Sequence, residues 1–275
     1  MNLIPTKSSH WYQHTPDGWT SCHEVPYADP RKGMRATTLR DARKLALAPS
    51  VTNILYVYPK PGLDAYKQTQ AILSALTLPR NEGEGDDDFA RRVVEDAQAH
   101  GKDAADLGSR IHDGINHWLT YKTFPPEDVL PYCKPVIKWL AEREINVLFA
   151  EQTVGSNRGY AGTLDLKGGL VGHGLSVVDF KTQKFPKNGK PNWYKDWPLQ
   201  LAAYAQAAAV PGESEPRLLS VAIDTDQPGR FEIKDWGRDI DRRYWYQFLN
   251  CFHTWKYDND YDPAQALNIP SHVPA

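Results

Sequence analysis

Two aspartates near the middle of the chain have the type and the spacing of a site for metal or acid–base chemistry. The segments GYAGTLDLKG (159–168) and LSVVDFKTQ (175–183) alternate as β-strands do, and the glycine-rich residues between them predict a turn centred near residue 172. That centre places Asp165 opposite Asp179, with Cβ atoms about 5 Å apart. Carboxylates this close raise a pKa unless a cation lies between them, and Mg²⁺ or another hard divalent cation prefers such oxygen ligands.

A lysine accompanies the second aspartate. Strand alternation places Lys181 on the same face as Asp179, with Phe180 on the other face. A buried Asp–Lys pair is costly unless it has a further use, and beside a metal ion the lysine can orient a water or stabilise charge developing on phosphorus. The alternative is a surface hairpin with polar residues on its wet face. The apolar residues that flank both acids favour the buried site.

The hairpin belongs to a longer run of predicted elements. A strand expected at 146–154 would complete a three-stranded meander with it. The N-terminal region predicts a small hairpin that turns at Pro16-Asp17-Gly18 and a helix that Ser50 caps. The other expected elements are helices at about 63–78, 86–120, 132–144 (beginning near Pro135), 198–210 and 236–256, and strands at 217–224 and near 230–234. This order predicts one mixed α/β domain.

Composition limits the class of protein. The 275 residues are 41% hydrophobic and 11% aromatic, which fits a folded globular chain. The formal net charge of −2 gives no general attraction to nucleic acid, so any polyanion site must be a local patch. The three separated cysteines predict neither a disulfide framework nor a zinc ribbon, and we expect a cytoplasmic protein without a membrane span.

One such patch follows the second strand. The segment KTQKFPKNGKPNWYKDW (181–197) interleaves lysines with aromatic residues. Lysines neutralise phosphates, and aromatic rings stack on unpaired bases. The candidate DNA contacts in it are Lys184, Lys187, Lys190, Trp193, Tyr194 and Lys195. The alternative is a solvated loop that its aromatic residues anchor.

About a third of the chain, residues 104–205, resembles the PD-(D/E)xK nuclease superfamily and, within it, the RecB-like exonucleases. The resemblance rests on YAGTLD, Asp179-Phe180-Lys181, Gln200 and Tyr204 in QLAAYA, and His112 in GSRIHDGINHWL. LAPSVTNIL (47–55) is similar to phage-type members and to the mitochondrial genome maintenance exonuclease. Leu164 stands where a proline often precedes the first acid, and the chain lacks the four cysteines of relatives with an iron–sulfur cluster, so no cluster is expected.

The resemblance implies roles for residues at the metal site. One or two Mg²⁺ or Mn²⁺ ions would be held by Asp165, Asp179, the Phe180 carbonyl and His112. Lys181 would activate the water or stabilise the phosphate.

Other roles are less closely defined. Glu151 would be a third carboxylate or would orient Arg158 or Lys181. Gln200 and Tyr204 would hold the substrate backbone or the catalytic strands. Arg158 is a further candidate DNA contact. Ser50 and Thr52 would touch a phosphate at a helix start, unless Ser50 only caps that helix.

The resemblance also implies a fold and an activity. We expect a restriction-endonuclease-like core at 101–275, with a central mixed sheet flanked by helices, and an N-terminal hairpin and helical extension at 1–100 that could line a substrate channel. The expected activity is metal-dependent exonucleolytic hydrolysis of linear single- or double-stranded DNA. The alternatives are an endonuclease of the same superfamily, of resolvase or restriction type, and a non-catalytic nucleic-acid-binding module.

Overall fold

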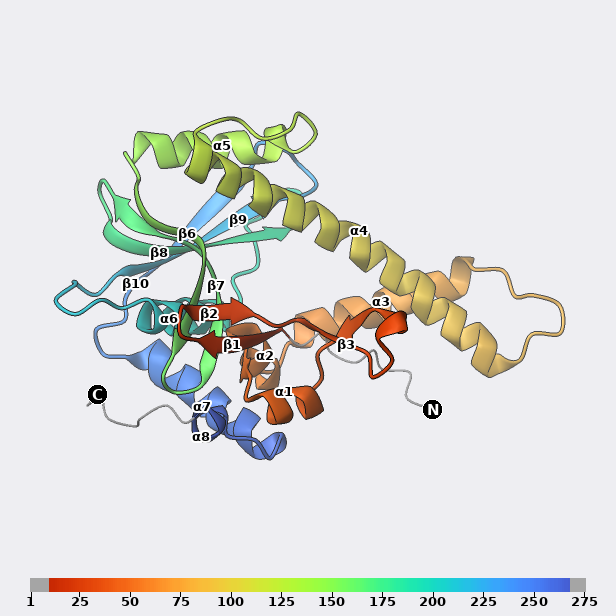
Figure 1. The fold of residues 1–275 in the computed structure, drawn as a ribbon. Helices are drawn as coiled ribbons and strands as arrows, with labels where there is room; N and C mark the ends of the chain where they lie inside the picture. The colour runs from red at the N-terminus through yellow and green to blue at the C-terminus, as the bar shows by residue number, and fades with distance from the viewer. Residues whose placement is uncertain (1–9, 268–275) are drawn as a thin grey trace.

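A five-stranded mixed β-sheet forms the centre of the computed structural model, which describes residues 10–267 without the side chains of Pro30 and of residues 100–104 (Figure 1). The strands, in the spatial order β10-β9-β8-β7-β6, are β6 (Asn146–Ser156), β7 (Tyr160–Leu170), β8 (Gly174–Gln183), β9 (Arg217–Asp224) and β10 (Phe231–Arg238). Neighbouring strands are antiparallel except β8 and β9, which are parallel and are connected through α6 (Trp197–Ala207). The expected α/β class and the expected meander are confirmed.

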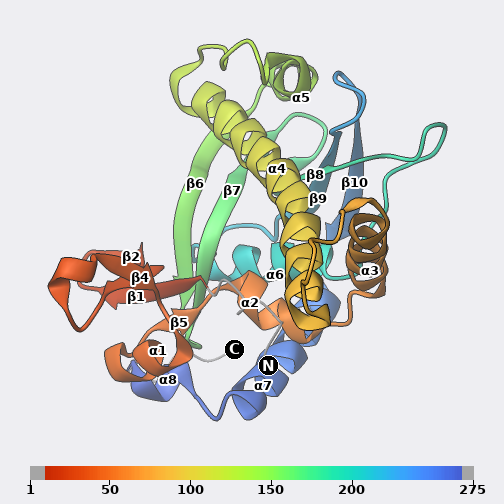
Figure 2. The same cartoon turned by 90° about the vertical axis from the view of Figure 1, so that its right-hand side faces the viewer.

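Helices cover both faces of this sheet (Figure 2). On one face, α4 (Asp86–Tyr121) and α5 (Leu130–Glu142) pack a cluster that includes Ile111, Val136, Leu166 and Phe180. On the other face, α6 and α7 (Arg243–Asp258) pack a cluster that includes Leu164, Val177, Leu199 and Phe248. Two separate apolar layers therefore sandwich the strands that carry the candidate residues.

The N-terminal elements share this core instead of forming a separate extension. A small sheet joins β1 (Trp11–Thr15), β2 (Gly18–Ser21) and β5 (Ala48–Pro49). Trp11, Leu47 and Ile54 belong to the same apolar cluster as α6 and α7. The division placed at residue 100 falls inside the continuous helix α4, and both parts contribute to one continuous unit.

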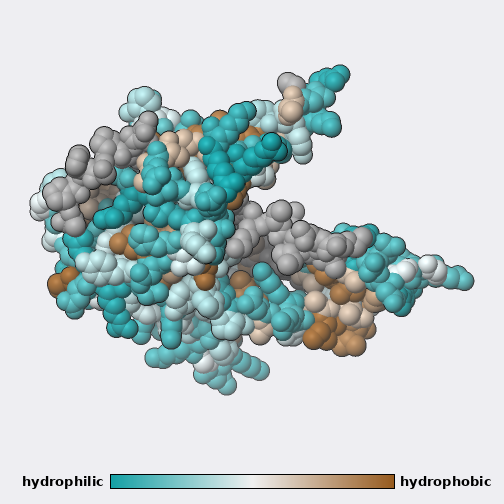
Figure 3. Space-filling model, turned by 90° about the horizontal axis from the view of Figure 1, so that it is seen from below, coloured by the Kyte–Doolittle hydropathy of each residue, from teal (hydrophilic) through white to brown (hydrophobic). Residues whose placement is uncertain are grey.

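Two projections extend from the body. Helices α3 (Pro61–Thr77) and α4 form an antiparallel hairpin that points away from the sheet (Figure 1). Seen from below, this hairpin and the β3–β4 region (Glu24–Pro26 and Met34–Ala36) are separate lobes with a recess between them (Figure 3). The first lobe shows brown surface, and the exposed aliphatic residues of α3 are Leu63, Ile72, Leu73 and Leu76.

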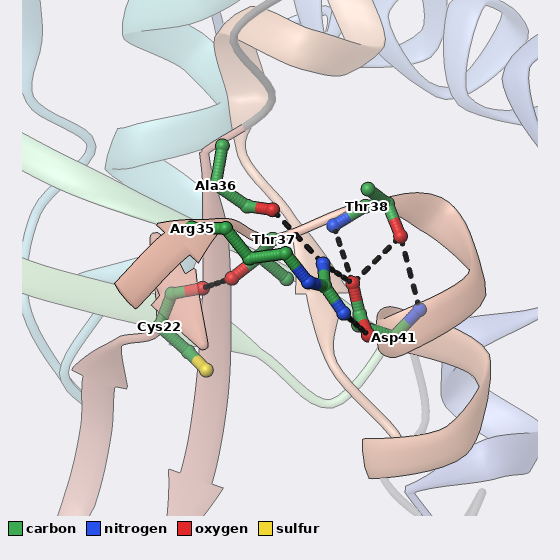
Figure 4. Close-up of polar contacts among 6 residues, drawn as sticks. All are labelled: Cys22, Arg35, Ala36, Thr37, Thr38 and Asp41. Atoms are coloured by element: carbon green, nitrogen blue, oxygen red, sulfur yellow. Dashed lines mark hydrogen bonds and ion pairs between the residues drawn. The ribbon is translucent and has the colours of Figure 1, made fainter. Parts of the chain in front are cut away.

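A capping box fixes the start of helix α1 (Leu39–Leu45). The Thr38 hydroxyl accepts from the Asp41 amide, and the Asp41 carboxylate accepts from the Thr38 amide at 2.9 Å. Arg35 donates to both oxygens of Asp41, at 2.6 and 2.7 Å (Figure 4). The Arg35 guanidinium thereby holds the pKa of Asp41 well below its usual range. Beside it, the Thr37 hydroxyl donates to the Cys22 carbonyl at 2.7 Å, which joins this helix start to the N-terminal hairpin.

Most remaining elements lie near their expected positions. The N-terminal hairpin turns at Pro16-Asp17, and Ser50 caps α2 (Val51–Ile54), which continues as the 3₁₀ turn Leu55–Val57. Helix α5 begins at Leu130 and contains Pro135 in its interior, so a helix start near Pro135 is wrong. The chain closes with α8 (Pro263–Ala266). Among residues 10–267, no helix has the length and apolar composition that a membrane crossing requires.

The candidate nuclease site

The two aspartates lie where strands β7 and β8 separate. Their ladder is paired from Leu170↔Gly174 to Leu166↔Val178, and its next step would pair Asp165 with Asp179. The backbone ladder stops there, and the Phe180 amide donates instead to Asp165 Oδ2 at 2.7 Å. The predicted register is confirmed, and the carboxylate of Asp165 takes the place of a backbone acceptor.

Asp179 and Lys181 form a buried ion pair. Lys181 Nζ lies 2.9 Å from Oδ1 and 2.8 Å from Oδ2 of Asp179, whose side chain is 3% exposed. The contact with Oδ1 has hydrogen-bond geometry. Oδ2 is buried and has no hydrogen bond to any of the described residues. Asp179 Oδ2 therefore has the Lys181 ammonium as its ionic partner but no well-formed hydrogen bond within the described part of the chain, which is costly in a closed core.

The electrostatics of this pair follow from burial. Burial raises the pKa of Asp179, the nearby charge of Asp165 raises it further, and Lys181 offsets only part of the rise. Burial pulls the pKa of Lys181 down, but the attraction of Asp179 and Asp165 outweighs it and leaves the lysine pKa above its usual value. Lys181 is therefore a cation at neutral pH, held among acids that repel each other.

Helix α6 supplies a chain of hydrogen bonds to the lysine. Lys181 Nζ donates to Gln200 Oε1 at 3.0 Å, and Gln200 Nε2 donates to the Tyr204 hydroxyl at 3.2 Å. Gln200 and Tyr204 reach the same point because they are four residues apart on one helix face. Gly162 leaves room for Tyr204, since a Cβ there would lie 2.7 Å from its ring. These two side chains thus fix the position of the ammonium group.

Helix α4 approaches from the other side. His112 Nδ1 lies 3.5 Å from Asp165 Oδ2, and its ring meets the Phe180 ring edge-on at 6.1 Å. One turn earlier, a Cβ at Gly108 would lie 2.7 Å from Thr182 Oγ1, so a glycine is needed for this close contact. His112 therefore faces Asp165 directly.

Glu151 joins the site from β6. It lies between the pairs Ala150↔Leu166 and Gln152↔Leu164, opposite Asp165, in the left-handed region with φ of 46°. Burial and the charge of Asp165 raise its pKa. Its predicted proximity to the acids is confirmed.

The donor set fits the divalent ion that the resemblance implies. Asp165, Asp179 and the Phe180 carbonyl supply oxygen donors, and Asp179 Oδ2 is a buried acceptor whose contact with Lys181 lacks hydrogen-bond geometry. Among the described residues, no three His, Cys, Asp or Glu side chains form a group that could hold a metal ion. Two carboxylates with a carbonyl and waters match Mg²⁺, which keeps several waters.

The lysine-rich loop is more structured than a solvated segment. Gln183 and Asn192 exchange two hydrogen bonds of 3.1 Å across its base, and Arg230 lies over the Phe185 ring at 5.0 Å. Lys184 pairs with Asp226 at 2.8 Å.

The ends of its other side chains differ in accessibility. Lys187, Lys190 and Lys195 are exposed, Tyr194 is 40% exposed, and Trp193 is half-buried against Trp197. The loop therefore presents cations and one accessible aromatic ring, while Trp193 also serves as an anchor.

Three predicted DNA contacts lie elsewhere. Ser50 is buried, and its hydroxyl caps α2 by accepting from the Asn53 amide at 2.9 Å, so a phosphate contact by its side chain is wrong. Thr52 is exposed on that short helix. Arg158 lies over the Trp245 ring in the β6–β7 turn, seven residues and roughly 20 Å of strand from Asp165.

Sequence reasoning missed two residues beside the site. The Tyr12 hydroxyl lies 3.2 Å from Thr163 Oγ1, which links the N-terminal hairpin to β7 two residues before Asp165. These residues are 151 positions apart, so no local periodicity could connect them. The alternation of β7 indicates only that Thr163 and Asp165 share a face.

Comparison with known proteins adds no family assignment: no model of a known protein family matches the chain, and no curated protein matches it significantly.

Proposed function

We propose that the protein is a metal-dependent deoxyribonuclease with a restriction-endonuclease-like core, acting as a RecB-like exonuclease on free ends of linear DNA. The observation that carries the proposal is the buried Asp179–Lys181 pair beside Asp165, in which Asp179 Oδ2 has the Lys181 ammonium at 2.8 Å but no hydrogen bond to any described residue. A buried pair of this kind is costly unless it has a further use, and two neighbouring carboxylates suit a divalent cation.

Different residues would perform different parts of the proposed reaction. Asp165, Asp179 and the Phe180 carbonyl would hold Mg²⁺ or Mn²⁺, which when bound polarises the scissile phosphate and lowers the pKa of a coordinated water. Lys181, fixed by Gln200, would hold the attacking water or stabilise the negative charge that develops on the phosphate.

The surroundings supply contacts for the strand. The exposed lysines of the 184–195 loop follow directly from β8 and would neutralise backbone phosphates on the way to the site. This local patch is compatible with a chain whose net charge is −2.

The test is digestion of end-labelled linear single-stranded and duplex DNA beside covalently closed circles, with Mg²⁺, Mn²⁺ or EDTA. Metal-dependent loss of linear DNA only, abolished by Asp165→Ala and by Lys181→Ala, is expected. Lys138→Ala, an exposed lysine on α5, is the matched control and should retain activity. Cleavage of circles would indicate an endonuclease, and binding without cleavage would indicate a non-catalytic module.

A further inference from the structure

The N-terminal hairpin carries a row of rings that the proposed mechanism does not use. The rings of His10 and His23, here named the histidine pair, stack with centroids 4.5 Å apart and planes 25° apart. Tyr12 meets His23 edge-on at 5.3 Å. Further along the same face, His14 packs on Trp19 at 4.9 Å. The row follows the β1–β2 register, in which His14 pairs with Trp19 and Tyr12 with Ser21.

This row runs along β7 toward the acids. Trp19 covers Gly155, where a Cβ would lie 2.3 Å from its ring, and Gly155 pairs with Ala161 of β7. Tyr12 reaches Thr163, further along β7 in the direction of Asp165. The histidine pair is the next member beyond Tyr12 and therefore lies on the side of the row nearest the candidate site.

The backbone gives the same direction. Ser50 directly follows β5 and forms a parallel bridge with Ala161 of β7. Its amide donates to the His10 carbonyl at 3.0 Å. In the β1–β5 ladder, Tyr12 pairs with Ala48, two residues before Ser50. Moving from Tyr12 to His10 therefore moves up β7.

The inner ring of the histidine pair is held by a hydrogen bond, and the outer ring is accessible. His10 is exposed and His23 is half-buried. His23 Nδ1 accepts from the Trp11 amide at 3.3 Å, which fixes its ring. Burial and the neighbouring His10 hold the pKa of His23 below its usual range, so the ring is neutral at pH 7. A flat ring that is already immobilised loses little side-chain entropy when another ring stacks on it.

We propose that the histidine pair is a stacking platform for an unpaired nucleobase of a strand held at Asp165 and Asp179, so that the site takes single-stranded DNA. The inference rests on the proposed nuclease function for its location. Its physical reason is that an unpaired base has a free π-face, whereas a base inside a duplex is already stacked on both sides.

The test is binding of a fluorescein-labelled single-stranded 12-mer and of the blunt duplex of the same sequence, measured by anisotropy in a Lys181→Ala background with Mg²⁺. His10→Ala and the double variant His10→Ala/His23→Ala should weaken single-strand binding about tenfold or more. Duplex affinity should change less than twofold. His10→Phe should retain single-strand affinity because it keeps a ring. His14→Ala, on the same hairpin, is the matched control.

Three outcomes would overturn the platform: no single-strand binding by the parent protein, equal affinity in all variants, or a loss that His10→Phe does not restore. Thermal melts of each variant beside His14→Ala separate unfolding from lost stacking. His10 is exposed, so His10→Ala leaves the packing of the half-buried His23 in place. If wild-type protein cleaves no DNA but binding depends on the histidine pair, the nuclease proposal fails and the platform stands.

Discussion

Asp41 and Asp179 each face a cationic side chain, yet the pKa values of their carboxyl groups are shifted in opposite directions. Arg35 donates to both oxygens of Asp41 and the Thr38 amide donates as well, so the pKa of Asp41 is lowered. Asp179 is almost fully buried beside Lys181, one of its oxygens has no hydrogen bond among the described residues, and its pKa is raised. The first pair completes a helix cap. The second is the pair on which the proposed metal site rests.

The difference lies in the cation as well as in burial. The planar guanidinium of Arg35 matches both carboxylate oxygens at once, which a single ammonium does not do. The Lys181 ammonium lies 2.9 and 2.8 Å from the two oxygens of Asp179 but forms a hydrogen bond only with Oδ1, and it also donates to Gln200. The following substitutions test whether this difference between the two pairs separates function from stability.

The largest expected effect is the loss of activity in Asp179→Asn. We expect the rate of linear DNA digestion with Mg²⁺ to fall by at least ~100-fold, because the amide lacks the charge that would hold the metal ion. The melting temperature of the same preparation separates loss of the metal ligand from destabilisation, because the substitution leaves the Lys181 ammonium without its carboxylate partner. The matched variant Asp41→Asn should digest DNA at the wild-type rate. Retained activity in Asp179→Asn would contradict the assignment.

The second prediction concerns pH. In EDTA, burial holds the pKa of Asp179 in the folded protein above the ordinary value of 3.8 that it has in the unfolded chain, so the folded state keeps its proton to higher pH. The wild type should therefore lose stability relative to Asp179→Asn as the pH rises above about 4. Chemical unfolding of both proteins across this range measures the difference. If the wild type instead gains stability relative to Asp179→Asn as the pH rises, the folded protein stabilises the charged carboxylate of Asp179, and the assignment is contradicted.

A smaller effect is expected at the helix cap. Thr38→Ala removes one half of the capping box and should lower the free energy of unfolding by about 1 kcal/mol. DNA digestion should be unchanged, because α1 contributes no residue to the candidate site. Urea unfolding and the digestion assay on the same preparation give both values, and a loss of activity at wild-type stability would mean that the N-terminal region takes part in the reaction.

The smallest effect concerns the loss of folding stability at acidic pH. The lowered pKa of Asp41 contributes stability that is present above its ordinary value of 3.8 and is lost as the pH falls below it. Because this pair lies near the surface, we expect Asp41→Asn to remove less than about 1 kcal/mol at pH 7. Melts between pH 2.5 and 5 should show a shallower acid loss in Asp41→Asn than in the wild type. If the melting temperatures of the two proteins fall equally between pH 5 and 2.5, another group controls the loss of stability in acid.

The sequence predicted the parts of the site that local rules determine. The turn centre near residue 172 fixes the β7–β8 register, and that register alone places Asp165 across from Asp179. Helical spacing similarly brings Gln200 and Tyr204 together. Both relations depend on residues that are near one another in the chain, and for that reason both were accessible to pattern reasoning.

Relations between distant segments were not accessible. The contact of Tyr12 with Thr163 depends on how the N-terminal hairpin packs on β7, which no periodicity encodes. Strand β10 continues to Arg238 and α7 begins at Arg243, although a helix was expected from residue 236. Pairing with β9 overrides the local preference there and places Trp236 against Ser220 of β9.

The continuity of α4 gives the molecule a mechanical property. This helix has 36 residues and a length of about 54 Å, and it joins the projecting α3–α4 hairpin to the turn that carries His112. Lys60, at the start of α3, is tied to Asp196, at the start of α6, by an ion pair of 2.9 Å. The projection is therefore connected to the candidate site at two points, to His112 through α4 and to the helix of Gln200 through the Lys60–Asp196 pair. A displacement of its tip would act on both.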